Sequence, residues 1–83
     1  MSATLRARSQ DALEVLKRSV QELISLHPQG LTNSQIADEL GLRSNYMGKH
    51  HGYLCWSILG LLLNEGRIAK RGSGQGAKYE CLP

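Results

Sequence analysis

The stretch GLTNSQIADELGL, residues 30–42, decides the predicted fold. Thr32 followed three residues later by Gln35 fits a capping box, in which two side chains satisfy backbone N–H groups at a helix start. Gly41 stands where a left-handed C-cap belongs. The buried face between these caps is formed by Ile36, Ala37 and Leu40. The stretch therefore predicts a short helix over residues 33–40 that ends in a tight turn.

A longer helix is predicted upstream, over residues 9–26. Ser9 is expected as its N-cap, with Asp11 and Glu14 complementing the helix dipole in the first turn. One apolar stripe recurs at helical spacing and consists of Leu13, Leu16, Val20, Leu23 and Ile24. Residues 1–8 are expected to form a flexible N-terminal arm, and the rest of the chain a single domain.

Downstream of the turn, a long helix is predicted from Ser44, as N-cap, to about Leu63 or Asn64. Its apolar stripe is expected to consist of Met47, His51, Leu54, Ile58, Leu61 and Leu62. The N-terminal half is more polar than the C-terminal half, so we expect it to project outward. Gly48 and Gly52 each cost helix stability relative to alanine. Close packing against another backbone is the favoured interpretation of these glycines, and a bend or break near Gly52 is the alternative.

The C-terminal residues predict a β-hairpin. Two short β-patterns, residues 67–71 and 77–82, flank the glycine-rich stretch 72–76. Gly72, Gly74 and Gly76 superficially resemble a phosphate-binding loop, but such a loop is followed by a helix and not by a strand pattern. The predicted fold class is therefore mainly α with a small β-hairpin (α+β).

Length and charge limit the function classes. The chain has 83 residues, which allows one small core and disfavours a deep catalytic cleft. Six basic and two acidic residues follow position 40 and give a net charge of +4, whereas four basic and five acidic residues before it give −1. A basic half on a near-neutral body favours an anionic partner. No apolar run is long enough for a membrane span, and no signal peptide is apparent, so a cytoplasmic location is expected.

The order helix, short helix, tight turn, long helix and hairpin resembles the winged-helix family of helix-turn-helix domains. Residues 30–42 resemble its capped second helix and turn, and residues 61–71 (LLLNEGRIAKR) resemble the end of a recognition helix entering the wing. The resemblance implies a three-helix helix-turn-helix core plus a C-terminal wing, over about residues 9–82. Residues 56–79 are also similar to winged-helix modules attached to bacterial restriction endonucleases, which implies a DNA-targeting module without the nuclease.

The resemblance implies sequence-dependent binding of double-stranded DNA, as a small transcription regulator or a DNA-targeting module. A helix N-terminus in the major groove reaches base edges, where Asn45 can offer an amide to adenine and Lys49 can contact guanine. The expected contacts on the long helix are Arg43, Ser44, Asn45, Tyr46, Lys49, His50 and Tyr53. Those at the start of the short helix are Thr32, Asn33 and Ser34. Those on the wing are Lys70, Arg71, Ser73, Gln75 and Lys78.

The sequence also bears on functions other than DNA binding. Winged helices also serve as protein-interaction modules, in which case Trp56, Tyr46 and Tyr53 would dominate binding. His51 and Cys55 are four residues apart, which zinc ligation permits, but no second ligand pair accompanies them. Nothing places a base beside a nucleophile, so no enzymatic activity is expected. No cofactor or metal is expected either. Because one small module binds DNA weakly, the expected partner besides DNA is a second copy or a larger catalytic protein.

Overall fold

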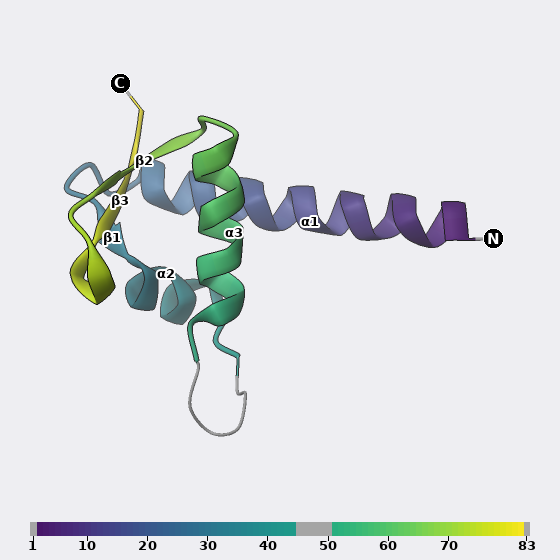
Figure 1. The fold of residues 1–83 in the computed structure, drawn as a ribbon, viewed down its shortest axis with the longest axis horizontal. Helices are drawn as coiled ribbons and strands as arrows, with labels where there is room; N and C mark the ends of the chain where they lie inside the picture. Colours follow the sequence, from purple (N-terminus) through teal and green to yellow (C-terminus); the bar gives the residue numbers. More distant parts are fainter. Residues whose placement is uncertain (1, 45–50, 83) are drawn as a thin grey trace.

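The computed structural model describes residues 2–44 and 51–82. Within them lie three helices and a three-stranded antiparallel sheet, so the predicted mixture of helices with a small β-hairpin is confirmed. Figure 1 shows α1 lying across the molecule and α3 crossing α1. The sheet and α2 lie near the C-terminal end of α1. The elements in chain order are α1 (Ser2–Ser25), β1 (Leu31–Thr32), α2 (Asn33–Leu40), α3 (Tyr53–Asn64), β2 (Ile68–Arg71), the 3₁₀ turn η1 (Gly74–Gly76) and β3 (Lys78–Cys81).

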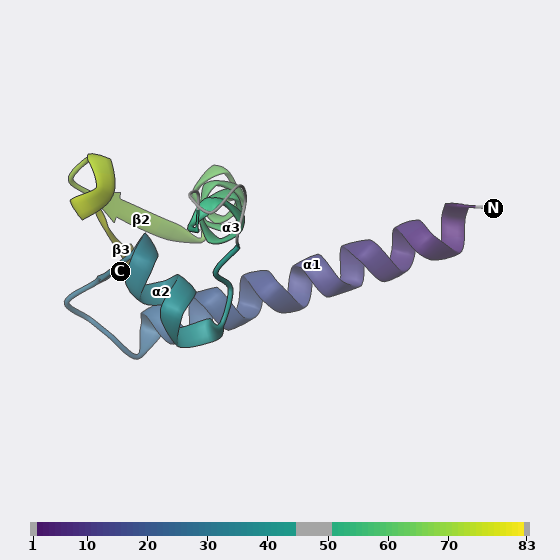
Figure 2. The same ribbon diagram turned by 90° about the horizontal axis from the view of Figure 1, so that it is seen from below.

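Helix α1 begins at Ser2, so the prediction that Ser9 is its N-cap is wrong. Asp11 and Glu14 accordingly lie well inside the helix and not in its first turn. Residues 3–8 contain alanine, leucine and arginine, which are good helix formers, and neither glycine nor proline interrupts them. The segment expected as an arm is therefore helical, and it projects beyond the body of the molecule (Figures 1 and 2).

Helix α2 has the predicted bounds and caps. The Thr32 hydroxyl accepts the Gln35 N–H at 3.2 Å, and the Gln35 side chain accepts the Thr32 N–H at 2.9 Å. Gly41 adopts φ +67°, and the Leu42 N–H reaches the Ala37 carbonyl at 2.8 Å. These contacts satisfy backbone groups at both ends, which explains how a helix of only eight residues persists.

Helix α3 begins at Tyr53, so the prediction of a continuous helix from Ser44 is wrong. Ser44 lies outside a helix, and its N–H bonds to the His51 carbonyl at 2.9 Å. Gly52 occupies the N-cap position with φ −106°, so the alternative of a break near this glycine is the correct one. Met47 and Gly48 lie outside the described residues.

The later start changes the buried face of α3. Its buried residues are Cys55, Ile58, Leu59 and Leu62. Leu54 and Leu61, both predicted in the core, are 45% and 38% exposed, and His51 is exposed as well. The positions of the predicted stripe were counted at helical spacing from Met47 and His51, as if one helix ran through Gly52. Because the helix starts only at Tyr53, that phase does not apply.

The β2–β3 hairpin forms as predicted, with η1 at its tip. Strand β1 is a third strand that the sequence analysis missed, because two residues are too short to show alternation. It pairs antiparallel with β3, which gives the sheet order β1-β3-β2. Gly30 precedes β1 with φ +89°, and a Cβ there would lie 3.1 Å from the Cβ of Lys78. A glycine is therefore what allows β1 to approach β3 this closely.

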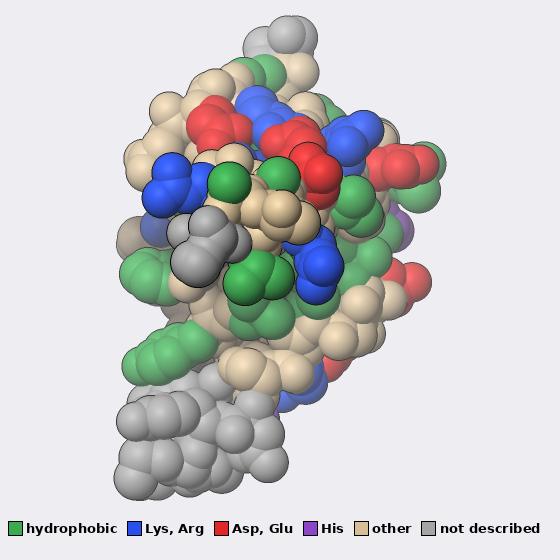
Figure 3. Space-filling view, turned by 90° about the vertical axis from the view of Figure 1, so that its right-hand side faces the viewer, with side chains coloured by type: hydrophobic (Ala, Val, Ile, Leu, Met, Phe, Trp, Pro, Cys, Tyr) green, Lys and Arg blue, Asp and Glu red, His purple; other side chains and the backbone are tan. Residues whose placement is uncertain are grey.

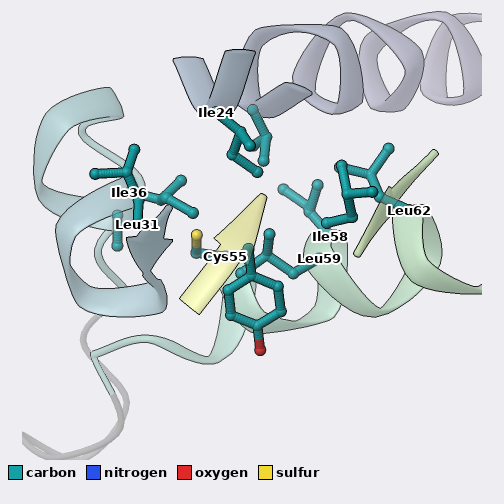
Figure 4. Packing of buried hydrophobic residues seen from close by; sticks show 11 residues of the cluster. Ile24, Leu31, Ile36, Cys55, Ile58, Leu59 and Leu62 are labelled. Atoms are coloured by element: carbon teal, nitrogen blue, oxygen red, sulfur yellow. The ribbon is translucent and has the colours of Figure 1, made fainter. Parts of the chain in front are cut away.

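The core lies where the three helices meet one face of the sheet. Figure 4 shows Ile24 of α1, Ile36 of α2 and Ile58 of α3 converging there. The full buried cluster is Val20, Ile24, Leu31, Ile36, Ala37, Cys55, Ile58, Leu59, Leu62, Ile68 and Tyr79. No helix in the described part of the chain is long and apolar enough to cross a membrane.

An ion-pair network joins α1 to the turn between α3 and β2. Arg67 donates to Glu14 at 3.1 Å and to Glu65 at 3.0 Å, and Lys17 donates to Glu65 at 2.6 Å. The hydrogen bond from Arg67 lowers the pKa of Glu14, and those from Lys17 and Arg67 lower the pKa of Glu65. This network links α1 to the α3–β2 turn on one face of the domain.

Candidate nucleic-acid interface

An open groove of about 630 Å³ lies between the starts of α2 and α3 and the hairpin tip. Three separate chain segments that were predicted to bind DNA meet in it. Asn33 and Ser34 come from α2, Tyr53 from α3 and Gln75 from the tip. The full lining is Asn33, Ser34, Ala37, Arg43, His51, Gly52, Tyr53, Trp56 and Gln75. The fold thus gathers residues 42 positions apart in the chain into one concave surface.

Asn33 connects the two helix starts at the base of the groove. Its amide nitrogen donates to the Gly52 carbonyl at 3.2 Å, and its backbone carbonyl accepts the Cys55 thiol at 3.8 Å. Its amide oxygen is buried and accepts no hydrogen bond within the described residues. Buried polar atoms of folded proteins nearly always have a partner, so this oxygen is an exception, and its burial keeps it out of direct reach of a ligand in the groove.

Aromatic side chains form the wall contributed by α3. Tyr53 and Trp56 are three residues apart and therefore share a helix face. They are 55% and 58% exposed, although both are large apolar side chains. This wall consequently offers stacking and apolar contact, and no basic residue of the described α3 stands on it.

Arg43 and Asp38 pair beside the groove, through a short hydrogen bond from the guanidinium to the carboxylate. This bond lowers the pKa of Asp38, so the carboxylate stays ionised at neutral pH. Arg43 is half-exposed despite the pair. A second anion can therefore reach the guanidinium, but at this position Asp38 offsets part of the positive charge.

The hairpin distributes its predicted contacts over two faces. Lys70 stands opposite Tyr79, so it lies on the face of the hairpin that turns toward the core, at the exposed end. Arg71 and Lys78 stand opposite each other on the other face. Arg71 also donates to the Gln29 carbonyl at 3.0 Å and pairs with Glu80 at 3.3 Å. Only Gln75 of the predicted wing residues lines the groove, and Ser73 is exposed next to it.

Some of the remaining predicted contacts already form hydrogen bonds within the protein, and the others lie outside the residues that the structure describes. The Thr32 hydroxyl is engaged in the cap of α2. Ser44 precedes the gap in the description, and its carbonyl contacts the His51 ring at 3.0 Å. Asn45, Tyr46, Lys49 and His50 lie outside the described residues, so their predicted roles stay predictions.

Four groove residues were not among the predicted DNA contacts, namely Ala37, His51, Gly52 and Trp56. His51 was assigned to the apolar stripe, and Trp56 was considered only as a protein-binding residue. The signal for His51 was its position directly before Gly52, where a helix start would expose it. For Trp56 the signal was its spacing of three residues from Tyr53, which was itself predicted at the interface.

Chemistry beyond binding finds little support in the described residues. No group of three or more His, Cys, Asp or Glu side chains there is placed to hold a metal ion. Burial raises the pKa of the Cys55 thiol to about 11, so this thiol is protonated at neutral pH and a poor nucleophile.

A scan against protein-family models, a search of curated proteins and a search of solved structures found no match to this chain.

Proposed function

We propose that this chain binds double-stranded DNA through a winged helix-turn-helix, with the groove at the centre of the interface. Several structural features support the proposal. The element order α1-β1-α2-α3-β2-β3, a sheet of order β1-β3-β2 and a capped α2 followed by a turn agree with that architecture. The observation that carries the proposal is the meeting of both helix starts and the hairpin tip in one groove.

The groove residues suit the two kinds of contact that DNA recognition needs. The Gln75 amide is exposed at the hairpin tip and is the side-chain type that pairs with adenine edges. Among the described residues, no side chain forms a cap hydrogen bond at the N-terminus of α3, and a helix N-terminus favours a phosphate. Base contacts then give sequence preference, and phosphate contacts fix the register.

The hairpin supplies the positive charge around the groove. Lys70, Arg71 and Lys78 lie on its two strands, and Gln75 and Ser73 occupy the tip between them. A duplex seated in the groove would have these cations along its backbone, where each phosphate neutralised releases a counterion. In this role the domain acts by positioning, as a small transcription regulator or as a module that targets a larger protein to DNA.

A protein-interaction module is the second candidate, and one observation favours it. Tyr53, Leu54 and Trp56 are all about half-exposed or more at the start of α3. Adjacent exposed apolar and aromatic side chains are typical of protein-binding surfaces. In this alternative the aromatic wall would carry the binding energy and the hairpin cations would contribute little.

A fluorescence-anisotropy titration of a labelled duplex at several salt concentrations tests the proposal. We expect a log–log slope of about −4 to −6, which corresponds to four to seven phosphate contacts. Trp56→Ala should weaken binding with little change in this slope, because Trp56 carries no charge. A chain that does not bind duplex even at low salt, while Trp56→Ala abolishes binding to a protein partner, would favour the second candidate.

A further inference from the structure

The N-terminal half of α1 has no packing partner among the described residues. Every side chain from residue 3 to residue 12 is exposed, and this part of the helix extends away from the body (Figure 2). A helical segment of about ten residues is only marginally stable alone in water, because most helical stability in proteins comes from packing one face. A second helix alongside it would supply that packing.

One face of α1 carries small and apolar residues at alternating spacings of four and three. This is the heptad spacing by which two helices pack side by side. The positions are Leu5, Ser9, Ala12, Leu16, Ser19, Leu23 and Leu26, the last just beyond the helix end. Leu5 and Leu26 are 56% and 70% exposed, whereas Leu16 and Leu23 are partly buried and pack against the edge of the core. Figure 3, which views the molecule from the N-terminal end of α1, shows hydrophobic side chains among charged ones on this side of the molecule.

We propose that a second copy of the chain packs antiparallel on this face, forming a two-helix dimer about an axis near residue 14. In this register, Leu5 meets Leu23 of the second copy, and Ala12 meets Leu16 of the second copy. Val15, which is 55% exposed on the flank of the stripe, meets its own counterpart beside the axis. The small residues Ser9 and Ser19 also face each other, which lets the helices approach closely.

Charge complementarity selects the second copy and the antiparallel direction. Arg8 and Glu22 lie on the same flank of the stripe, both are exposed, and neither forms an ion pair within the described residues. The antiparallel register brings Arg8 of each chain to Glu22 of the other, which gives two ion pairs. In a parallel dimer these residues would stay about 21 Å apart along the axis, since each of the 14 intervening steps rises 1.5 Å.

This dimer goes beyond the proposed DNA binding and does not depend on it, because association is measured without nucleic acid. It would place one groove at each end of the paired helices, related by a two-fold axis. Such an arrangement matches two half-sites of a palindromic duplex, if the groove binds DNA.

Sedimentation equilibrium of the full chain over a concentration series tests the dimer. Arg8→Glu and Glu22→Arg should each weaken dimerisation about fivefold, because two exposed ion pairs are replaced by like charges. The double variant Arg8→Glu with Glu22→Arg should restore it. Arg6→Glu is the matched control. It makes the same charge change two residues away, on a different side of the helix, and should leave the dimer unchanged.

Hydrogen exchange gives a second readout that does not depend on variants. Amides of residues 3–12 should become more protected as the protein concentration rises, because dimerisation packs this segment. A chain that remains monomeric at millimolar concentration would overturn the proposal. So would a dimer that Arg8→Glu leaves intact, or one that the double variant fails to restore.

Discussion

The side-chain amide of Asn33, the first residue of α2, donates a 3.2 Å hydrogen bond to the carbonyl of Gly52, the residue directly before α3. A Cβ on residue 52 would lie 2.7 Å from the amide nitrogen of Asn33, so only glycine leaves room for this bond. The contact links the starts of the two helices that frame the groove. The geometry of the candidate interface therefore depends on one asparagine and one glycine.

Gly52→Ala should lower the free energy of unfolding by about 1–2 kcal/mol, because the added methyl group displaces the Asn33 amide and leaves buried polar atoms unsatisfied. Urea denaturation measures this change. Gly60→Ala is the matched control, since Gly60 lies inside α3 and a Cβ there has no neighbour within 4 Å. It should stabilise the domain by up to about 1 kcal/mol, because alanine favours helix. Equal stability of the two variants would contradict the role assigned to Asn33.

The revised phase of α3 gives a second prediction. Ile58→Ala should cost about 2–5 kcal/mol, because the Ile58 side chain is 1% exposed and its truncation leaves a cavity. Leu54→Ala should cost less than about 1 kcal/mol, because Leu54 is 45% exposed. Thermal unfolding of both variants compares them directly. A larger loss of stability in Leu54→Ala than in Ile58→Ala would contradict this buried face. It would favour the face expected for a helix continuous from Ser44.

The sequence predicted the elements whose signals are local. Helix α2 and the hairpin were predicted because a capping box, a C-cap glycine and a glycine-rich turn each act within a few residues. The predicted first residues of α1 and α3 were wrong for different reasons. Ser9 is a good cap that continuous helix formers before it make unnecessary, and Ser44 is a good cap by residue type although α3 begins only at Tyr53, after Gly52. The three segments that line the groove could be predicted from the sequence. The Asn33–Gly52 contact and the groove itself could not, because they form only when these segments come together in the tertiary fold.

The carboxylates of the Arg67 network predict a loss of stability in acid. Arg67 lowers the pKa of Glu14, and Lys17 together with Arg67 lowers the pKa of Glu65, each through hydrogen bonds to the ionised form. A lowered pKa in the folded state means that the stabilisation is present above the unfolded pKa of about 4.3 and is lost as pH falls below it. The urea midpoint of the chain should therefore fall from pH 5 downwards.

Glu65→Gln should flatten this pH dependence while reducing stability at neutral pH. Glu39→Gln serves as the control, because Glu39 is exposed on α2 and lies outside the network. Urea midpoints at a series of pH values for the three proteins make the comparison. An unchanged acid slope in Glu65→Gln would exclude the network as its source.

The hairpin cations differ in the protein groups that they contact, so their variants should differ in duplex affinity. Lys70→Ala should lower the salt slope of duplex binding by about one, as expected for one lost phosphate contact. Arg71→Ala should weaken binding more, because it also leaves the Glu80 carboxylate without its 3.3 Å partner beside the DNA. Glu80→Gln should strengthen binding for the same reason.

Arg6→Ala is the control for these variants, because Arg6 is exposed on the part of α1 that projects away from the hairpin (Figure 1). Anisotropy titrations at matched salt concentrations rank the four variants. If Arg6→Ala weakens binding as much as Lys70→Ala, the hairpin is not a preferred contact.

The most direct test of the central claim is a map of amide and indole NMR shifts on adding a short duplex. Binding through the groove predicts that the largest changes fall on Asn33 and its side-chain amide, on Gln75 and on the Trp56 indole. The amides around Glu14, Lys17 and Arg67, on the face formed by α1 and the α3–β2 turn, should stay unchanged. Shifts concentrated on that face, or none at any duplex concentration, would contradict the assignment of the groove as a DNA-binding surface.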